Sequence, residues 1–562
     1  MKRYRINEIK MPIDADKSKL PKVIAGKLNL RESDIKSWEL RRQSIDARDK
    51  SDVHYVYTVD FYTDRKIKNK KCQEITSESE LKSRLESGAE SGSERKRLVG
   101  RPVVIGMGPC GIFAALELAR AGLSPLVLER GPAMHERITA VKNFRRSGLL
   151  DPEANMLYGE GGAGTFSDGK LGTGIKDGAV RDVLREFADA GAGEEITYLN
   201  KPHIGTDVLR TVIVNLRNKI EELGGEIRFN TKLEKLNIDC GELKSIEINT
   251  YSGAGISCER TQRETVQTNA IILAVGHSAR DTFAMIREAG LAMEQKPFSI
   301  GVRMEHPQAL IDRAQYGEEA LEKYDGLLPP ADYKLSTHTS SGRGVYSFCM
   351  CPGGEVVVCS TAEGELCVNG MSNRKRDSGT ANSGILCDVR CEDYNNGNPE
   401  DVLAGVRFQQ KYERLAYENG LKQHGVKFRA PSCSMEEFLN AGLNAGKGNA
   451  DDGTVTNAGC EMPTCDNAEY VINSLPPYAA VAIQEAVPDF ARKIKDYDNP
   501  DAIITAVETR SSSPVRILRD RNGESNIKGV YPAGEGAGYA GGITSAACDG
   551  IRAARHIIMK IS

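Results

Sequence analysis

Apolar and polar positions alternate with a period of two in the first part of the chain. The run 54–62 (HYVYTVDFY) has aromatic or β-branched residues at every second position, which predicts a strand. An extended segment over 4–13, a helix over 19–28 and another strand over 37–45 come before it. This order is typical of a ferredoxin-like or similar open-faced sandwich, so residues 1–73 are predicted to form a small α+β module.

The pattern changes at Val99, where short apolar runs begin to alternate with helical segments, as a parallel sheet with crossover helices requires. The preceding residues 74–98 are polar and rich in Ser and Glu, which predicts a linker. Residues 296–496 are richer in Gly, Asn and Cys and show no helical period in their first half. The sequence therefore predicts an α/β domain built from 99–295 and 497–562, with an inserted α+β domain between its two parts.

The same apolar pattern argues against a membrane protein. The longest apolar stretch, 103–128, contains Glu117, Arg120 and several glycines, so no run of about twenty apolar residues predicts a transmembrane helix. The first ten residues, MKRYRINEIK, lack the apolar core of a secretory signal, and a cytoplasmic protein is expected. The 14 cysteines among 562 residues are too few for a disulfide scaffold, and most should be free thiols.

Charge is spread unevenly along the chain. Residues 1–73 carry 19 Lys and Arg against 11 Asp and Glu, whereas the whole chain has a net charge of −3. A basic module on an acidic body has two interpretations. A solvated lysine-rich surface is the simpler one, and RNA binding is the alternative.

The most specific motif is VVIGMGPCGIFAAL, which begins at Val103 and joins an apolar strand to an apolar-faced helix through G-x-G-x-x-G. Gly106 makes the tight turn, Gly108 lets a pyrophosphate approach the backbone, and Gly111 lets the helix pack on the strand. Pro109 and Cys110 open the helix, whose N-terminal N–H groups and dipole favour phosphate. The motif predicts a dinucleotide site.

A second strand completes this unit. It ends in Glu129 and Arg130, and Glu129 follows Gly106 by 23 residues, where a carboxylate accepts the adenosine ribose hydroxyls. An acid at this position argues against a 2′-phosphate. Further along, the run FNTKL ending at Leu233 resembles the strand whose backbone meets the adenine, and AIILAVG ends at Gly276 before the crossover.

The C-terminal segment indicates which dinucleotide binds. From Val530 the sequence VYPAGEGAGYAGGITSAACDGI predicts a strand, a glycine-rich turn and a final helix. In flavoproteins with two dinucleotide-binding domains such a segment meets the ribityl chain, and its helix points its N-terminus at the flavin pyrimidine. This favours FAD. The candidate contacts here are Gly534, Glu535, Gly541, Gly542 and Ile543.

The segment 159–170 (GEGGAGTFSDGK) has five glycines in twelve residues and suits a flavin neighbour, with a glycine-rich surface loop as the alternative. Its exposed N–H groups and side chains can hydrogen-bond phosphate or the flavin ring. The candidates are Gly161, Gly162, Thr165, Ser167 and Lys170.

Together these motifs resemble a mostly uncharacterised family of bacterial FAD-dependent dehydrogenases, related to the glutathione-reductase-type flavoproteins. The match rests on YGEGGAGTFSDGKL from Tyr158, KPHIGTD from Lys201, SFCMCPGG from Ser347, VETRSSSPVR from Val507 and the C-terminal GEGAGYAGG. It spans essentially the whole chain, including the N-terminal module. The resemblance implies FAD, a glutathione-reductase-like Rossmann-type domain and a dehydrogenase-like flavin site. It implies no particular substrate.

Three residues are candidates for catalysis. Arg510 precedes the C-terminal strand and is expected near the substrate, where its guanidinium can hold a carboxylate at two points; an ion pair between domains is the alternative. His203 and His277 are candidate proton donors or acceptors, although single histidines are more often structural. The pair Cys349 and Cys351 matches no standard metal or C-x-x-C pattern, so structural thiols and no metal are expected.

Motifs that are missing after the first helix bear on which molecule exchanges electrons with the flavin. Residues 205–330 contain no second G-x-G-x-x-G unit, and no C-x4-C pair directly follows the first helix, so neither a dedicated pyridine-nucleotide domain nor thiol–disulfide reduction is expected. The sequence therefore predicts an FAD-dependent oxidoreductase acting on a small molecule, with NAD(P)H as a transient donor at most. The alternatives are an RNA-directed flavoprotein that uses 1–73 and an FAD-binding sensor without turnover.

Overall fold

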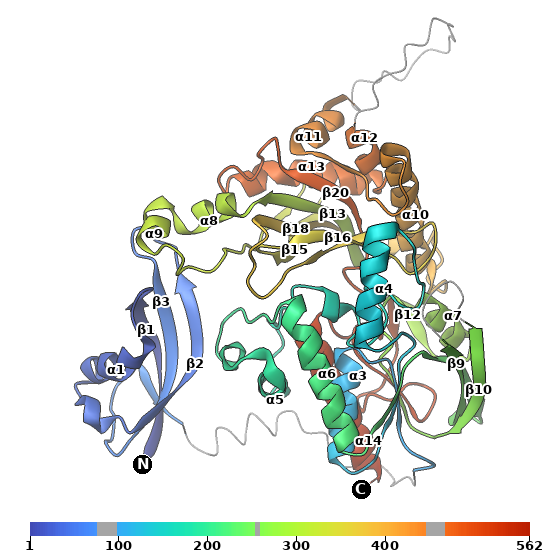
Figure 1. Cartoon of the computed structure of the whole chain (residues 1–562), viewed down its shortest axis with the longest axis horizontal. Coiled ribbons are helices and arrows are strands. Elements are labelled where there is room, and N and C mark those ends of the chain that lie inside the picture. Colours follow the sequence, from blue (N-terminus) through green and yellow to red (C-terminus); the bar gives the residue numbers. More distant parts are fainter. Residues whose placement is uncertain (76–97, 253–258, 445–466, 562) are drawn as a thin grey trace, which may run out of the picture.

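The computed structural model describes residues 1–75, 98–252, 259–444 and 467–561, arranged in three parts (Figure 1). The predicted linker lies almost wholly outside the described residues. Among the residues described, no helix is both long enough and apolar enough to cross a bilayer.

The N-terminal part is a four-stranded antiparallel sheet of order β2-β3-β1-β4, with α1 packed on one face. Its elements are β1 (Lys2–Pro12), α1 (Leu20–Leu28), β2 (Ser37–Asp46), β3 (His54–Thr63) and β4 (Cys72–Glu74). Alternate side chains of β1 and β3, among them Tyr4, Ile6, Val59 and Phe61, form its core. On the opposite face Arg3, Arg5 and Arg41 all bind the buried carboxylate of Asp60, which neutralises part of the module's positive charge.

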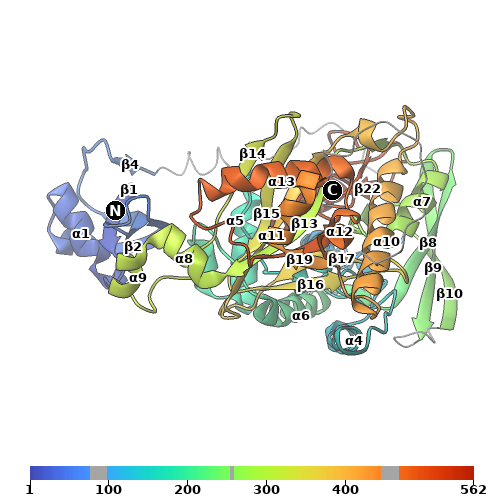
Figure 2. The ribbon, with the colours of Figure 1, turned by 90° about the horizontal axis from the view of Figure 1, so that it is seen from above.

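This module contacts both other parts. The edge of β2 continues into the segment 198–200, because Gln43 accepts from the Asn200 N–H at 2.9 Å and donates its own N–H to the Tyr198 carbonyl oxygen at 2.7 Å. Ile13 and Val53 belong to the hydrophobic cluster of the inserted domain. Seen from above, the module lies at one end of the molecule and β8–β10 at the other (Figure 2).

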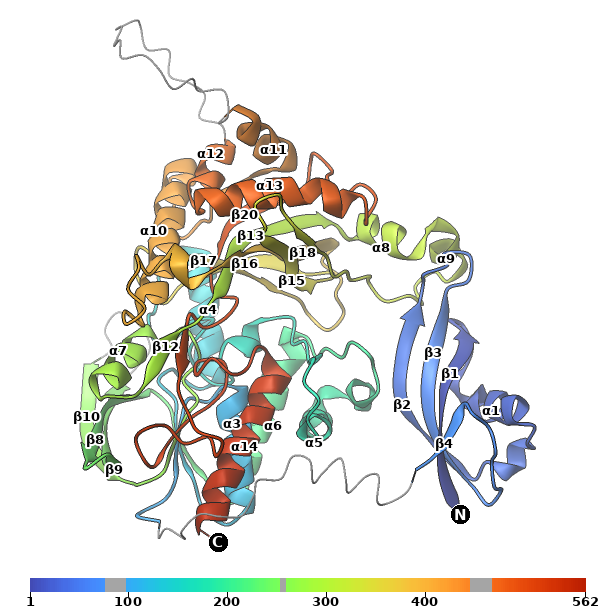
Figure 3. The same cartoon turned by 180° about the vertical axis from the view of Figure 1, so that it is seen from behind.

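The second part is a five-stranded parallel sheet of order β22-β11-β5-β6-β7. Its strands are β5 (Val103–Ile105), β6 (Leu126–Leu128), β7 (Glu226–Arg228), β11 (Ile271–Leu273) and β22 (Val530–Pro532). One face is covered by α3 (Pro109–Arg120), α6 (Thr206–Glu222) and α14 (Ile543–Ile561), which lie side by side (Figure 3). The other face is covered by the antiparallel sheet β8 (Thr231–Asp239), β9 (Glu242–Ser252) and β10 (Glu259–Gln267).

Burial on both faces explains why these strands read as continuous apolar runs. Val104 of β5 packs toward α3 and α14, whereas its neighbours Val103 and Ile105 pack toward β8 and β9. Strand β22 pairs with β11, so the last thirty or so residues complete a sheet that begins at Val103. This is a Rossmann-type fold, as the sequence predicts.

The third part has a six-stranded antiparallel sheet of order β14-β15-β18-β13-β20-β19. Its strands are β13 (Phe298–Pro307), β14 (Ser336–His338), β15 (Gly344–Cys351), β18 (Thr380–Val389), β19 (Ser432–Ser434) and β20 (Ile503–Glu508). The hairpin β16 (Glu355–Cys359) and β17 (Cys367–Met371) lies beside it, and β12 (Met293–Gln295) pairs with β21 (Val515–Ile517) where the chain enters and leaves. Its helices are α8 (Gln308–Tyr316), α9 (Glu318–Lys323), α10 (Ala404–His424), α11 (Met435–Asn444), α12 (Asn467–Ile472) and α13 (Pro477–Ala491).

Two details of the predicted inserted domain differ from the structure. Strand β20 belongs to its sheet through pairing with β13, so the domain extends to Glu508 rather than ending at 496. Helices α8 and α9 lie in the half where no helical period is visible, because nine and six residues are too few to display one.

Candidate functional site

A cavity of about 390 Å³ lies at the carboxyl ends of β5, β6, β11 and β22 and is closed on its other side by the inserted domain. Ligands of open α/β sheets bind at this edge. Six segments of the cofactor domain line it: the turn after β5, the end of β6, the loop around 157–172, the start of β8, the loop after β11 and the segment 533–546. Residues from β15, β17 and β20 form the facing wall.

The three glycines of the G-x-G-x-x-G motif are needed for different structural reasons. A Cβ on Gly106, which has φ +99°, would lie 2.5 Å from the Ala274 carbonyl oxygen, and a Cβ on Gly111 would overlap the carbonyl oxygen of Gly106. Gly108 has no such neighbour, since its Cβ would meet only the Gly162 Cα at 3.9 Å. The fold therefore needs glycine at 106 and 111. At 108 the requirement comes from a ligand that approaches the backbone at the N-terminus of α3, and a pyrophosphate fits this cradle.

The carboxylate of Glu129 is buried at the end of β6. It accepts the N–H of Met107 at 2.8 Å through one oxygen and the N–H groups of Gly131 and Gly159 at 2.9 and 3.0 Å through the other. It lines the cavity as well, so one side chain joins the phosphate turn to the following loops at the ribose position. Arg130 is held differently, by ion pairs with Glu153 and Asp281 over the ring of Tyr158.

The loop that follows α4 (Met134–Ser147) is shaped by a buried arginine that the sequence did not reveal. Arg137 is fully buried and donates to the carbonyl oxygens of Asn155, Glu160 and Gly162 at 3.0, 2.6 and 2.9 Å. These bonds fix the loop so that Gly162 faces the cavity, together with Ser167 and Lys170.

Two predicted contacts in this loop, Gly161 and Thr165, do not line the cavity. The Gly161 N–H donates to the Met107 carbonyl oxygen at 2.9 Å, and the buried Thr165 hydroxyl donates to the Glu160 carbonyl oxygen at 3.3 Å. Both are used to close the loop on itself. Gly111 is also absent from the lining, because its role is the contact between α3 and β5.

The C-terminal segment enters the cavity as the sequence predicts. The lining residues there are Gly534, Glu535, Gly541, Gly542 and Ile543, with Gly276 and Leu233 nearby and Pro109 and Cys110 at the start of α3. Glu535 accepts the Gly542 N–H and lies 3.6 Å from His277 Nδ1. Burial raises the pKa of Glu535, but these contacts lower it overall.

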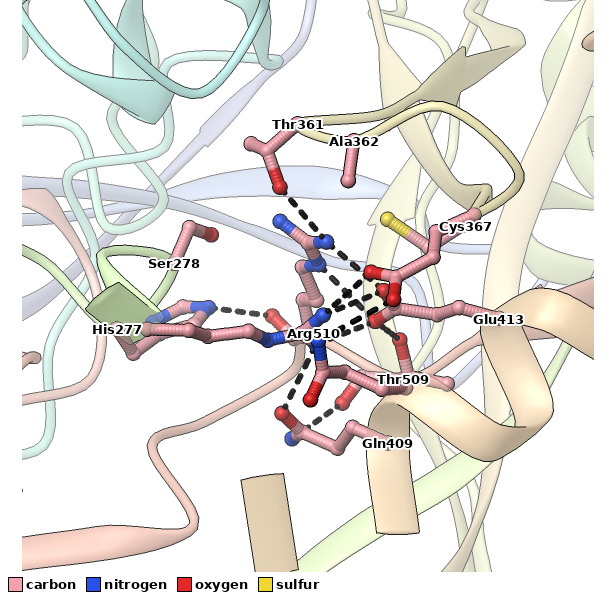
Figure 4. A network of polar contacts seen from close by, with 12 residues as sticks. His277, Ser278, Thr361, Ala362, Cys367, Gln409, Glu413, Thr509 and Arg510 are labelled. Carbon is pink, nitrogen blue, oxygen red and sulfur yellow. Dashed lines mark hydrogen bonds and ion pairs between the residues drawn. The ribbon is translucent and has the colours of Figure 1, made fainter. Parts of the chain in front are cut away.

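Arg510 lines the cavity, but its guanidinium is already engaged (Figure 4). Its Nε and Nη2 lie 3.0 and 2.8 Å from the two carboxylate oxygens of Glu413 on α10, and Nη2 also donates to the Thr361 hydroxyl at 3.2 Å. Arg280, from α7 (Arg280–Glu288) of the cofactor domain, binds the same carboxylate at 2.7 Å. The expected two-point grip on a substrate carboxylate is therefore wrong, since Glu413 occupies both positions.

The two candidate histidines differ in position. His277 lines the cavity, and its Nε2 lies 3.0 Å from the Arg510 carbonyl oxygen; because a carbonyl only accepts, Nε2 carries a proton. His203 does not line the cavity. Its Nε2 contacts the Arg374 carbonyl oxygen, and burial lowers its pKa, so its placement does not support the predicted proton transfer to substrate.

The wall from the inserted domain contains residues that sequence reasoning missed. Phe348, Asn369 and Glu508 line the cavity beside Cys349. The fully buried Arg303 of β13 holds this wall, with Nε 2.6 Å from Glu508 Oε2 and Nη2 3.0 Å from Asn369 Oδ1. Burial raises the pKa of Glu508 to about 7 despite this ion pair. The sequence signal for this residue was an acid, Glu508, at the end of the apolar run IITAVE.

Fold and cavity define a flavoprotein of the Rossmann class, and the comparisons with known proteins agree. The model "FAD-dependent protein, C-terminal domain-like" matches residues 297–511, "Pyridine nucleotide-disulphide oxidoreductase" matches 100–302, and a domain of unknown function matches 1–62. A protein of Clostridium beijerinckii, described as uncharacterized, is 43% identical over 573 residues, covering 99% of this chain and 98% of its own. The chain belongs to the same family of FAD-dependent proteins. It is an FAD-binding oxidoreductase.

Solved structures of flavoenzymes are more distant. The L-proline dehydrogenase of P. horikoshii is 13% identical, covers 83% of this chain and 94% of its own, and has a TM-score of 0.30. CtdE in complex with FAD is 11% identical with coverages of 82% and 84% and a TM-score of 0.30. A quinol fumarate reductase of E. coli is 11% identical with coverages of 84% and 71% and a TM-score of 0.32.

Proposed function

We propose that this protein exchanges a hydride between its flavin and a small organic substrate held against the inserted domain. The observation that supports this most is a single cavity with two kinds of wall. One wall consists of glycine-rich turns and a helix N-terminus, which suit a dinucleotide, and the other carries ionisable side chains of the inserted sheet. A site that only bound FAD would not need the second wall.

The residues present fit FAD along the whole cavity. The turn at Gly106–Gly108 and the N-terminus of α3 would hold the pyrophosphate, Glu129 the adenosine ribose, and Gly534 with Glu535 the ribityl chain. The N-terminus of α14 would meet the pyrimidine end, where its dipole favours negative charge. When bound there, FAD supplies two-electron redox chemistry.

The inserted wall supplies proton and charge control. Glu508, whose pKa burial raises to about 7, can hold or release a proton near neutral pH. Lys170 lies 3.7 Å from Asp168. Burial lowers the pKa of Lys170, but the neighbouring Cys351, Cys349 and Asp168 raise this pKa overall. Its ammonium group would therefore stay charged and stabilise a negative substrate group.

The test is to photoreduce the purified holoprotein without oxygen and then add compounds one class at a time. We expect at least one small organic class to re-oxidise the photoreduced flavin within turnover times. In a second arm that starts from oxidised holoprotein, NAD(P)H should reduce the flavin no faster than a substrate does. Flavin that responds to no organic compound would instead support the FAD-binding sensor. A fast reaction confined to NAD(P)H would move the proposal to a pyridine-nucleotide oxidase.

Glu129→Gln is expected to weaken FAD binding about 10- to 150-fold, since loss of a charged hydrogen bond costs roughly 1.5–3 kcal/mol. The amide keeps the volume but replaces one of the two carboxylate oxygens, which between them accept the Met107, Gly131 and Gly159 N–H groups and would accept the ribose hydroxyls. Calorimetry of FAD binding to apoprotein measures the change. The control is Glu117→Gln, which removes only the ion pair between Glu117 on α3 and Arg555 on α14. Equal affinity in both variants would mean that another group holds the ribose.

A further inference from the structure

Strand β15 ends in a bulge that presents a cysteine to the cavity. Phe348 pairs with Gly384 and Cys351 with Asn382, so two residues of β15 oppose one residue of β18, and Cys349 takes a left-handed conformation with φ +43°. A non-glycine residue in this region is strained, and such residues cluster at functional sites. Bulges beside active sites re-aim side chains.

The bulge gives its two thiols different surroundings. Cys349 is half-buried and lines the cavity, whereas Cys351 is fully buried behind it, with Sγ 3.2 Å from the Cys349 carbonyl oxygen. Lys170, from the glycine-rich loop on the opposite side, and Arg303 are the nearby cations. Two acids are nearby as well: Asp168, ion-paired to Arg376 at 2.6 Å, and Glu508, ion-paired to Arg303 at 2.6 Å.

The two thiols also differ in ionisation. A hydrogen bond from the Cys351 thiol lowers the pKa of Cys349, and Lys170 and Arg303 act in the same direction against burial. The same hydrogen bond and burial raise the pKa of Cys351. These directions favour a thiolate at Cys349, which is open to the cavity, and a thiol at Cys351 behind it, the arrangement that thiol–disulfide exchange needs.

The other cavity cysteines do not share this character. Cys110, Cys359 and Cys367 also line the cavity, but burial raises the pKa of each, to about 12 for Cys359. A buried neutral thiol is a small apolar side chain. Among the described cysteines on this cavity, Cys349 alone combines access with stabilised negative charge.

We propose that Cys349 and Cys351 are a redox-active dithiol that exchanges an electron pair with FAD, which makes small disulfides the substrate class. This rests on the proposed function. In one half-reaction the thiolate and the thiol join as a disulfide, giving two electrons and the Cys351 proton to oxidised FAD. The reverse restores the dithiol from reduced FAD.

Toward a disulfide substrate, the Cys349 thiolate attacks one sulfur, forms a mixed disulfide and releases one substrate thiolate. Cys351 then attacks the Cys349 sulfur, the Cys349–Cys351 bond forms, and the second substrate sulfur leaves with the Cys351 proton. The substrate gains two electrons, and reduced FAD is their source. The helix after the first strand lacks the C-x4-C pair expected of a disulfide reductase, and the inserted sheet would provide a pair from the opposite wall.

The decisive measurement is an anaerobic dithionite titration of the wild-type holoprotein. We expect four electrons per FAD, two for the flavin and two for the disulfide, and two electrons for C349S and for C351S, each with FAD still bound. Two control variants should still take four electrons. C240S removes an exposed cysteine outside the cavity, and C460S removes one cysteine of the pair Cys460 and Cys465. Mass spectrometry of the oxidised protein should find a 349–351 disulfide, in apoprotein as well as holoprotein.

Two electrons per FAD in wild-type protein, with thiols 349 and 351 both free, would overturn the dithiol while leaving the hydride-exchange function intact. Four electrons that fall to two only in C359S would place the centre in the β16–β17 hairpin and would also overturn it. A flavin that dithionite reduces but no organic compound re-oxidises would count against the proposed function, and the electron count would still report on the dithiol separately.

Discussion

Gly108→Asp is expected to give a folded protein that is colourless. The fold leaves room for a Cβ at this position, since the nearest protein atom, the Gly162 Cα, would lie 3.9 Å from it. Its carboxylate would stand where the pyrophosphate approaches the N-terminus of α3. Like charges in contact cost several kcal/mol, which is a loss of FAD affinity of more than about 100-fold.

The measurements are visible flavin absorbance, FAD content, and circular dichroism compared with wild-type apoprotein. Gly108→Ala is the matched control and should bind FAD more weakly than wild type but more tightly than Gly108→Asp, since it adds volume beside the pyrophosphate without adding charge. Gly111→Ala should fail for a different reason, because its Cβ overlaps the Gly106 carbonyl oxygen and forces α3 from β5. A yellow Gly108→Asp protein, or one that is unfolded while Gly108→Ala is folded, would contradict this account of the cradle.

Glu413→Gln is expected to lower the free energy of unfolding by about 3–5 kcal/mol, the cost of removing one partner from a buried ionic cluster. The Glu413 carboxylate is fully buried and binds Arg280 of the cofactor domain, Arg510 of the returning segment and the Thr509 hydroxyl (Figure 4). The amide leaves the Arg510 guanidinium without its carboxylate partner and leaves Arg280 with only the ion pair to Glu365. It should therefore loosen the contact between the inserted and cofactor domains.

Urea unfolding followed by flavin release and by circular dichroism measures this loss. The control is Glu363→Gln, whose ion pair with Lys427 is exposed and worth about 0–1 kcal/mol. Burial raises the pKa of Glu413, but Arg280 and Arg510 lower it overall. The contribution of this carboxylate to stability is therefore complete above the unfolded pKa of about 4.3. It is lost only as the pH falls toward the folded pKa. The difference between Glu413→Gln and wild type should thus be constant from about pH 6 to 9. A difference that vanishes near pH 7 would contradict it.

The sequence by itself determined the cofactor domain. Gly106, Gly108, Gly111 and Glu129 lie within one β-α-β unit, where backbone geometry and a fixed spacing place the groups for the pyrophosphate and the adenosine ribose. The apolar runs of β5 and β6 could be identified because both faces of a parallel sheet are buried. The strand at Val530 was identified for the same reason, although it pairs with β11 from far along the chain.

Only the tertiary structure decided which side chains face the substrate. Arg510 and Glu413 are 97 residues apart, and nothing in the spacing shows that the helix that carries Glu413 meets the segment after β20 that carries Arg510. The bulge that turns Cys349 toward Lys170 depends on the pairing of β15 with β18, and the enclosure of Thr165 depends on how its loop closes. Such contacts are set by how the inserted sheet packs against the cofactor domain. They depend on distances between elements, which local hydrophobic pattern and motif spacing do not encode.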